Sequence, residues 1–287
     1  MLEAAVCRAL DTGDESGLRV LGYGEISTVV ALETPAGTFA CKRLPPFPGE
    51  APLSAYRACL TDYLSRLAGA GIDVVPTTLE ALPRGDGRIT AWCVQPILRA
   101  ADLLPKYLAG CDEVEAVRVF EVLLERIERC VGPRLGLDGQ LSNWALVEGR
   151  LTYLDVTTPM LRDEAGRDLL DMDLFLASLP WLLRGLVKRF MLAGILGKYF
   201  VPRGVVVDLL ANLYKERLER LLPPFLAKAQ GRFTPAITEE KVRGYYADDA
   251  RTWALLLAVR RFDRWWQRKI RRRTYPFLLP GNIERHA

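Results

Sequence analysis

The segment from residue 136 to 159, GLDGQLSNWALVEGRLTYLDVTTP, places two carboxylates and one carboxamide around a pair of short apolar runs. Asp138 and Asn143 lie in a turn-rich stretch before the first run, WALV, which indicates a loop that leads into a strand. The turn EGR and the second run, LTYLDV, complete a predicted hairpin that carries Asp155 back toward Asp138 and Asn143. Oxygen atoms of these types suit a hard cation such as Mg²⁺, whose other ligands are phosphate oxygens and water.

Two glycines near the N-terminus, in RVLGYGEISTVV, separate two β-prone runs. We expect a hairpin whose first strand ends in a glycine turn. Because Gly22 and Gly24 have no side chain, the backbone there can approach phosphate groups closely. A plain hairpin turn that needs glycine for a positive φ would give the same pattern, so this feature alone leaves both interpretations open.

Lys42 lies in FACKRL, on the strand expected after the glycine hairpin. Strand alternation can place its ammonium group under the glycine turn, and it directs the neighbouring Arg43 to the opposite face, where we expect it to be solvated. An isolated lysine is usually a surface charge. The order of the glycine turn, Lys42, D-x-x-x-x-N and a later aspartate is therefore more informative than any one of them.

In that order and spacing, the chain resembles the protein-kinase-like superfamily, and within it the small-molecule branch of aminoglycoside and choline phosphotransferases. The resemblance covers nearly the whole chain. It implies an α+β, two-lobed fold, with a small antiparallel β-rich lobe over residues 1–98 and a larger α-helical lobe over residues 99–287. The opening LGYGEISTVV also resembles that of bacterial families of unknown function.

The resemblance implies an ATP- and Mg²⁺-dependent phosphotransferase that acts on a hydroxyl group of an unidentified small molecule. The residues that would bind the nucleotide are Gly22, Gly24, Ser27, Lys42 and Gln95. Ser27 stands where the kinase-type loop has its third glycine, and Gln95 begins the connector that would hold the adenine. Asn143 and Asp155 would bind Mg²⁺, and Asp138 would deprotonate the acceptor hydroxyl.

The sequence departs from the superfamily at three places. Gly136 stands where a histidine is usual, and Val156 and Thr157 stand where Phe-Gly often follows the metal-binding aspartate. The helix predicted after the lysine strand lacks the glutamate that pairs with the lysine; Asp62 is its only carboxylate, with Glu50 upstream. These departures favour an alternative, a catalytically weak or inactive pseudokinase-like module for nucleotide binding or scaffolding. Nucleotidyl transfer is a further alternative, and the acceptor stays open.

The rest of the chain predicts a sheet followed by helices. The runs IDVVPTTLEAL and RITAWCVQPIL each predict a strand that completes the first sheet. Residues 55–71 predict a helix with an apolar face made of Tyr56, Leu60, Tyr63, Leu64 and Leu67. Residues 112–130 predict an amphipathic helix, and residues 205–230 a long helix that ends near the prolines at 223 and 224 or slightly beyond them. Residues 174–201 are the most apolar region, but charges and a proline interrupt it, so we expect buried helices and no transmembrane span.

The C-terminal part combines a helix pattern with tryptophans and a basic cluster. The cluster contains Arg260, Arg261, Arg264, Arg268, Lys269, Arg271, Arg272 and Arg273. We favour a packed final helix in which Trp265 and Trp266 belong to the core. The same pattern is typical of segments that contact an anionic membrane surface, an anionic substrate or nucleic acid, so these partners stay open.

Composition excludes several function classes. The only histidine is His286, so neither a Ser-His-Asp triad nor an H-E-x-x-H zinc site is present. The six cysteines form no C-x-x-C pair, which favours reduced cysteines in a cytoplasmic protein. The acidic N-terminus does not have the pattern of a secretory signal. A net charge of +4 is a mild basic bias, which suits an anionic ligand.

Overall fold

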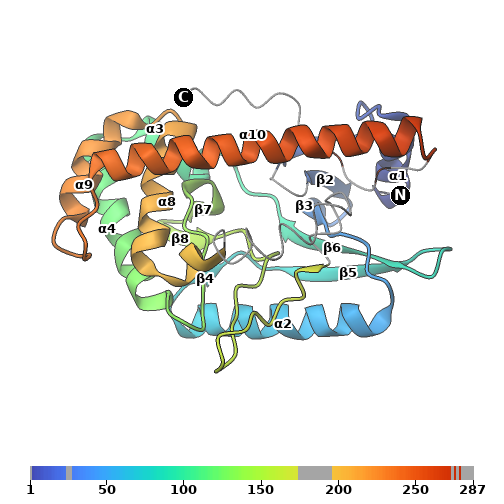
Figure 1. Cartoon of the computed structure of the whole chain (residues 1–287), viewed down its shortest axis with the longest axis horizontal. Coiled ribbons are helices and arrows are strands. Elements are labelled where there is room, and N and C mark those ends of the chain that lie inside the picture. Colours follow the sequence, from blue (N-terminus) through green and yellow to red (C-terminus); the bar gives the residue numbers. More distant parts are fainter. Residues whose placement is uncertain (1, 24–27, 174–195, 273–274, 276–277, 279–287) are drawn as a thin grey trace.

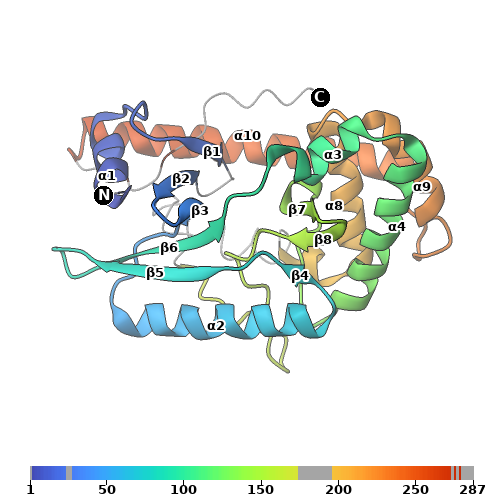
Figure 2. The same cartoon turned by 180° about the vertical axis from the view of Figure 1, so that it is seen from behind.

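The computed structural model describes residues 2–23, 28–173, 196–272, 275 and 278. It has a mixed α/β architecture. A sheet and its covering helices lie at one end of the long axis, and most of the other helices lie at the other end (Figures 1 and 2). The helix α10 (Glu239–Lys269) runs along both ends.

The larger sheet is antiparallel and has the strand order β1-β2-β3-β6-β5. Its strands are β1 (Val20–Tyr23), β2 (Thr28–Thr34), β3 (Gly37–Arg43), β5 (Thr78–Pro83) and β6 (Ile89–Pro96). The pairing of β1 with β2 confirms the predicted glycine hairpin. Gly24 and Ser27, which we assigned to its turn, lie outside the described residues.

Helix α2 (Glu50–Gly69) runs along one face of this sheet, parallel to its long edge (Figure 2). Its buried residues include Tyr56, Leu60, Tyr63 and Leu67, which recur at helical spacing and match the predicted apolar face. The helix begins at Glu50, so this glutamate is its first residue and does not lie upstream of it.

Helix α1 (Leu2–Thr12), which the sequence patterns did not predict, packs against another part of the sheet. Val6 and Leu10 form a small apolar cluster with the strand residues Cys41 and Trp92. The expectation that Arg43 is solvated is wrong, because its Nη2 lies 2.7 Å from Oε1 of Glu3 in α1, and only 9% of its side chain is exposed.

A second sheet has the order β4-β8-β7, with β4 (Asp73–Val74), β7 (Trp144–Val147) and β8 (Arg150–Tyr153). The β7–β8 hairpin is the predicted one; Glu148 and Gly149 form its turn, both at positive φ. The run IDVVPTTLEAL is not one strand of the larger sheet. It divides at Pro76, and its first part, β4, pairs in parallel with β8.

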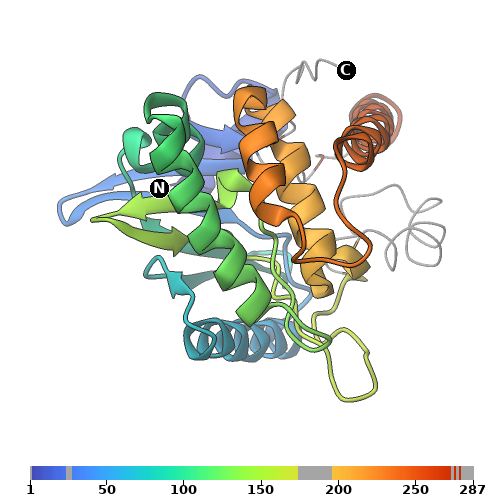
Figure 3. The same cartoon turned by 90° about the vertical axis from the view of Figure 1, so that its left-hand side faces the viewer.

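The helical end, seen in Figure 3, contains α3 (Leu104–Gly110), α4 (Glu113–Cys130), α8 (Pro202–Lys215) and α9 (Leu222–Ala229). Helix α4 confirms the amphipathic helix predicted over residues 112–130, and Asp112 caps it by accepting the Glu115 amide N–H at 2.8 Å. The prolines at 223 and 224 do not end a long helix; they lie in the first turn of α9, where their missing N–H groups cost little.

The buried side chains of the two ends form one continuous core, which extends from Leu44 through α2, α4 and α8 to Tyr246. The expectation that Trp265 and Trp266 belong to this core is wrong, because they are 50% and 43% exposed. Residues 174–195 of the apolar region lie outside the described residues. Among the helices that the structure describes, none is both long and apolar enough to cross a membrane.

Candidate active site

A cleft of about 660 Å³ is lined by residues of the larger sheet, the loop before β7 and the segment after β8. This size is typical of small-molecule sites. Its lining includes all the predicted site residues that the structure describes, namely Gly22, Lys42, Gln95, Asp138, Asn143 and Asp155. The fold therefore brings together residues that are up to 133 positions apart in the chain, from Gly22 to Asp155.

Lys42 and Asp155 form an ion pair inside the cleft. The Nζ of Lys42 lies 2.8 Å from Oδ1 of Asp155, and Thr157 donates its hydroxyl to the same oxygen, also at 2.8 Å. Burial raises the pKa of the Asp155 carboxyl, but the Lys42 ammonium and the Thr157 hydrogen bonds outweigh this effect and hold the pKa below its usual value. The carboxylate is therefore ionised at neutral pH.

The loop between α4 and β7 carries Asp138 and Asn143. The amide N–H of Gln140 donates to Oδ1 of Asp138 at 3.1 Å, and the Asn143 side chain donates to the Asp138 carbonyl at 3.4 Å. The carbonyl of Asn143 accepts the amide N–H of Leu154 at 2.8 Å. The last bond connects this loop directly to the residue before Asp155.

Gly136 lies where the chain is too crowded for any side chain. A Cβ atom there would lie 2.9 Å from Cβ of Met160 and 3.1 Å from the carbonyl oxygen of Tyr199. The backbone of Gly136 instead bonds to its neighbours: its N–H donates to Met160, and its carbonyl accepts the hydroxyl of Tyr63 at 3.1 Å. These bonds fix the start of the loop without the histidine that is usual in the superfamily that the sequence resembles.

Two buried tyrosines of α2 contact the two loops of the site. Tyr63 bonds to Gly136, two residues before Asp138, and Tyr56 donates its hydroxyl to the Thr157 carbonyl at 2.9 Å, two residues after Asp155. The sequence patterns placed both tyrosines on the core-facing side of the helix but did not indicate their polar contacts. Their hydroxyl groups make α2 a support for the site.

The carboxylates of α2 make other contacts. Asp62 accepts a hydrogen bond from Arg66, and Glu50 accepts one from Ser54. Among the described residues, Lys42 forms its ion pair with Asp155. The sequence lacks the helix glutamate that would pair with the lysine, and the structure agrees with this. Lys42 pairs with the predicted metal-binding aspartate and not with a carboxylate of α2.

Gln95 lies on β6, in register with Ala40 of β3. Its side-chain amide donates to the Thr77 hydroxyl at 2.9 Å and to the Leu154 carbonyl at 2.8 Å. Next to it, the amide N–H of Ile97 donates to Thr38 at 3.2 Å. Gln95 thus lines the cleft and also connects the sheet to the segment that carries Asp155.

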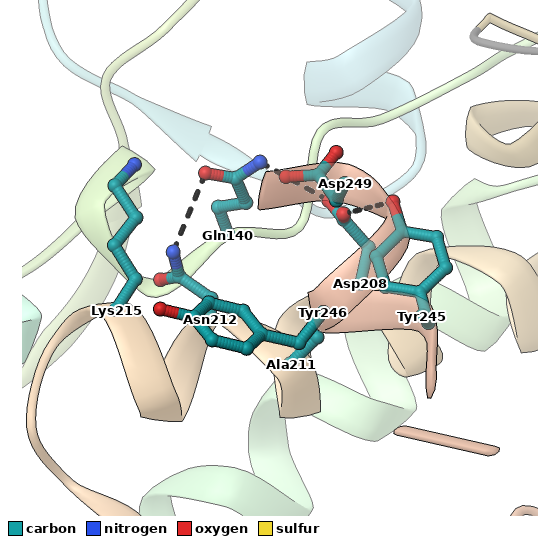
Figure 4. Close-up of a pocket in the computed structure, with 8 residues that line it drawn as sticks. All are labelled: Gln140, Asp208, Ala211, Asn212, Lys215, Tyr245, Tyr246 and Asp249. Atoms are coloured by element: carbon teal, nitrogen blue, oxygen red, sulfur yellow. Dashed lines mark hydrogen bonds between the residues drawn. The ribbon is translucent and has the colours of Figure 1, made fainter. Parts of the chain in front are cut away.

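A buried polar network lies behind the Asp138 loop and was not predicted from the sequence (Figure 4). Gln140 donates to Oδ2 of Asp208, a buried residue of α8, at 3.2 Å. Oδ1 of Asp208 accepts from Lys198 at 2.9 Å and from the hydroxyl of Tyr245, on α10, at 2.5 Å. Asn212, one turn beyond Asp208, accepts the Leu141 amide at 3.2 Å. The loop that carries Asp138 is therefore attached to α8 and α10.

The lining of the cleft combines apolar and charged residues. The apolar ones include Val29, Ala40, Val75, Cys93, Ile97, Leu98, Leu103 and Leu154. Lys215 and Glu216, at the end of α8, also line the cleft, and the sequence patterns did not single them out. Burial raises the pKa of Glu216. A flat apolar group and an anionic group would both find complementary surfaces here.

Comparison with family models gives one match, described as "Family of unknown function (DUF6206)", over residues 1–264. Comparison with curated proteins gives no match. Among solved structures, the chain is similar to a mutant form of the PknI kinase domain of Mycobacterium tuberculosis, with 16% sequence identity and a TM-score of 0.30 over 65% of this chain and 87% of that one. A TM-score of 0.30 is too low to establish a common fold.

Proposed function

This chain belongs to the family of unknown function DUF6206, and we propose that it is an ATP- and Mg²⁺-dependent phosphotransferase that acts on a hydroxyl group of a small molecule. The observation that carries the proposal is the convergence of Lys42, Asp138, Asn143 and Asp155 in one cleft. These residues come from β3, from the loop before β7 and from the end of the β7–β8 hairpin. Phosphoryl transfer requires this combination of a cation, metal-binding oxygen atoms and a carboxylate base.

Each side of the cleft has a role in the proposal. The apolar residues of the lining would accept the adenine, with Gln95 at the end of β6 beside it. Gly22 would cover the phosphates together with Gly24 and Ser27, the two other residues that the sequence assigns to this role. Lys42 would hold the phosphates by its ammonium group. It would exchange part of its contact with Asp155 for the phosphate oxygens.

Asp138 would accept the proton of the acceptor hydroxyl. Its carboxylate takes the Gln140 amide N–H on Oδ1, and this bond orients the carboxylate. A carboxylate base must lie within hydrogen-bonding distance of the hydroxyl that it deprotonates. The part of the cleft near Asp138, Gln140 and Glu216 would therefore hold the acceptor.

The residues of the cleft fit a magnesium ion. Among the described residues, Lys42 and Thr157 donate to Oδ1 of Asp155, and Oδ2 is the atom suited to a cation. Asn143 uses its amide nitrogen to bond to Asp138, and its carboxamide oxygen is the second candidate ligand. Among the described residues, no group of three or more His, Cys, Asp or Glu side chains could hold a metal; Mg²⁺ bound with ATP needs only one or two carboxylates. When bound, Mg²⁺ would neutralise charge on the phosphates.

The proposal includes a two-lobed, protein-kinase-like arrangement, with a β-rich lobe over residues 1–98 and an α-rich lobe over residues 99–287. The strand position of Lys42 supports it, since the lysine of that fold also lies on its third strand. We also propose a cytoplasmic location, which is supported by the six cysteines, none of which forms a disulfide.

Calorimetry of ATP binding with and without Mg²⁺ tests the proposal. The wild type should bind Mg²⁺-ATP, and both Lys42→Ala and Asp155→Ala should weaken binding by at least about tenfold. Lys241→Ala, an exposed lysine of α10 far along the chain from the cleft residues, is the matched control and should bind as the wild type does. Absence of ATP binding by the wild type, or equal binding by all three variants, would contradict the proposal.

A second candidate is a pseudokinase-like module that binds a nucleotide without transferring phosphate. The observation that favours it is the Lys42–Asp155 pair, because a lysine that stays bound to the metal-binding aspartate is not available to the phosphates. The two candidates differ in turnover. A phosphotransferase consumes ATP when a mixture of hydroxyl-bearing acceptors is added, whereas the module binds ATP with no acceptor-dependent consumption.

A further inference from the structure

The C-terminal half of α10 presents an apolar face that the other described residues leave exposed. It consists of Leu255, Phe262, Trp265, Trp266 and Ile270, which are 66%, 62%, 50%, 43% and 53% exposed. Their spacing follows the helical repeat, so they lie along one side of α10 over about 16 Å between Leu255 and Trp266. The rings of Phe262, Trp265 and Trp266 lie beside one another, with centroids 5.7 to 6.5 Å apart.

The α10 apolar face lies in a stretch of sequence that is rich in cations and poor in acids. Residues 250–272 contain a single acid, Asp263, which is buried. The same residues contain eight cations, Arg251, Arg260, Arg261, Arg264, Arg268, Lys269, Arg271 and Arg272. Lys269, Arg271 and Arg272 are exposed at the end of the helix, next to the tryptophans. An apolar face beside exposed cations complements a partner that has anionic groups at its surface and an apolar interior beneath them.

Charge argues against two other ways to cover the face. Residues 174–195 are apolar in sequence, but they contain three cations and no acid. A second copy of α10 would bring the same cations together. Positive charge is already concentrated here, since Arg268 and Arg261 lie close enough to Arg264 to lower its pKa together with burial. Either occupant would add like charge to this region, which disfavours both.

We propose that the α10 apolar face docks on an anionic membrane surface, with Phe262, Trp265 and Trp266 in the headgroup region and Lys269, Arg271 and Arg272 against the anionic headgroups. Tryptophan is enriched at such interfaces because its ring is apolar and its N–H is polar. Leu255 and Ile270 favour lipid over nucleic acid, since aliphatic side chains give no stacking platform for bases. The proposal does not depend on the proposed phosphotransferase activity.

Co-sedimentation of the full chain with lipid vesicles tests the proposal. The wild type should bind vesicles that contain phosphatidylglycerol, bind phosphatidylcholine vesicles much more weakly, and lose binding as salt increases. Replacing Lys269, Arg271 and Arg272 with serine should weaken binding by about a hundredfold, because each cation near an anionic surface contributes about fivefold. The Phe262→Ser, Trp265→Ser, Trp266→Ser triple variant should weaken binding by at least about tenfold.

Matched controls lie elsewhere on the surface. Val114→Ser, on α4, removes an apolar side chain that is 81% exposed, and Arg150→Ser removes an exposed cation of the β7–β8 hairpin. Both should bind vesicles within about twofold of the wild type. Three results would overturn the proposal: no binding of the wild type to anionic vesicles, equal loss in the controls, or an oligonucleotide bound through this face in the absence of vesicle binding.

A measurement on conservative variants covers the case in which the serine variants do not fold. Acyl-chain-brominated lipids should quench the tryptophan fluorescence of the wild type on anionic vesicles. The Trp265→Phe, Trp266→Phe variant keeps the apolar face and should bind equally well, but most of the lipid-dependent quenching should be lost. Unchanged quenching in this variant would place the lipid contact at another tryptophan and overturn the proposal.

Discussion

The Nζ of Lys42 lies 2.8 Å from Oδ1 of Asp155, so one ion pair connects β3 to the segment after β8. The two residues are 113 positions apart in the chain. The pair makes the electrostatics of the cleft depend on the folded structure, since the unfolded chain does not hold these groups together. Its contribution to folding must therefore change with pH.

We predict that acid removes the stabilisation that Asp155 provides. The pKa of Asp155 is lowered in the folded chain, whereas an unfolded aspartate has a pKa of about 3.9. At acidic pH the unfolded chain therefore binds more protons at this residue than the folded chain does. The stabilisation from Asp155 is complete above about pH 5 and is lost as the pH falls toward the pKa of the folded state. Urea unfolding at several pH values should show that the difference between the wild type and Asp155→Asn shrinks below about pH 4.

The control for this pH dependence is Asp62→Asn. Asp62 is exposed and pairs with Arg66 on the surface of α2, so its loss should change the free energy of unfolding by less than about 1 kcal/mol. A constant difference between the wild type and Asp155→Asn down to pH 2 would contradict the role of the ion pair.

Substitution of Asp138 should affect phosphoryl transfer, whereas substitution of Asp155 should affect the binding of Mg²⁺-ATP. Asp138→Ala should abolish phosphoryl transfer and leave the affinity for Mg²⁺-ATP nearly intact, since a base contacts the acceptor and not the nucleotide. Asp155→Ala should lose the Mg²⁺ dependence of ATP binding, since its carboxylate is the proposed metal ligand. Calorimetry and single-turnover assays on both variants check this. Equal loss of ATP binding in the two variants, or unchanged turnover in Asp138→Ala, would contradict the assignment.

The hydroxyl of Tyr56 should stabilise the segment that carries Asp155. Tyr56→Phe leaves the buried Thr157 carbonyl without this donor, which should cost about 1–3 kcal/mol of unfolding free energy. ATP affinity should fall as well, but less than in Asp155→Ala. Tyr107→Phe removes a hydroxyl that donates to Glu115 at 2.8 Å, away from the cleft, and should leave ATP affinity unchanged. If both variants had the same ATP affinity as the wild type, Tyr56 would have only a general packing role.

Features that depend on residues close together in the chain could be predicted from the sequence. The β7–β8 hairpin was predicted from its turn, helix α4 from its apolar periodicity and the strand of Lys42 from its apolar neighbours. These local patterns place Lys42, Asn143 and Asp155 on their own elements, and all three residues line the cleft.

Features that depend on distant partners could not be predicted in this way. Arg43 was expected in solvent because nothing near it in sequence indicates that α1 supplies Glu3. Tyr56 was expected to be a core residue, but helical periodicity does not reveal a bond to a carbonyl 101 positions away. Trp265 was expected in the core on apolarity alone, although its position on α10 leaves it half exposed.

Gly136 should be required for the geometry of the Asp138 loop. In Gly136→Ala the new Cβ would lie 2.9 Å from Cβ of Met160 and 3.2 Å from the ring of Phe200, so the loop or its neighbours must shift. We expect a loss of about 1–3 kcal/mol in unfolding free energy, as for other overpacked sites, and slower turnover because Asp138 moves with the loop. Gly132→Ala is the matched control, since no atom lies within 4 Å of its added Cβ, and the smaller backbone freedom of the unfolded chain should leave that variant as stable as the wild type or slightly more so. Equal unfolding midpoints in urea for the two variants would show that the structure around Gly136 accommodates a Cβ atom without a loss of stability. Crowding would then not explain why this position has a glycine.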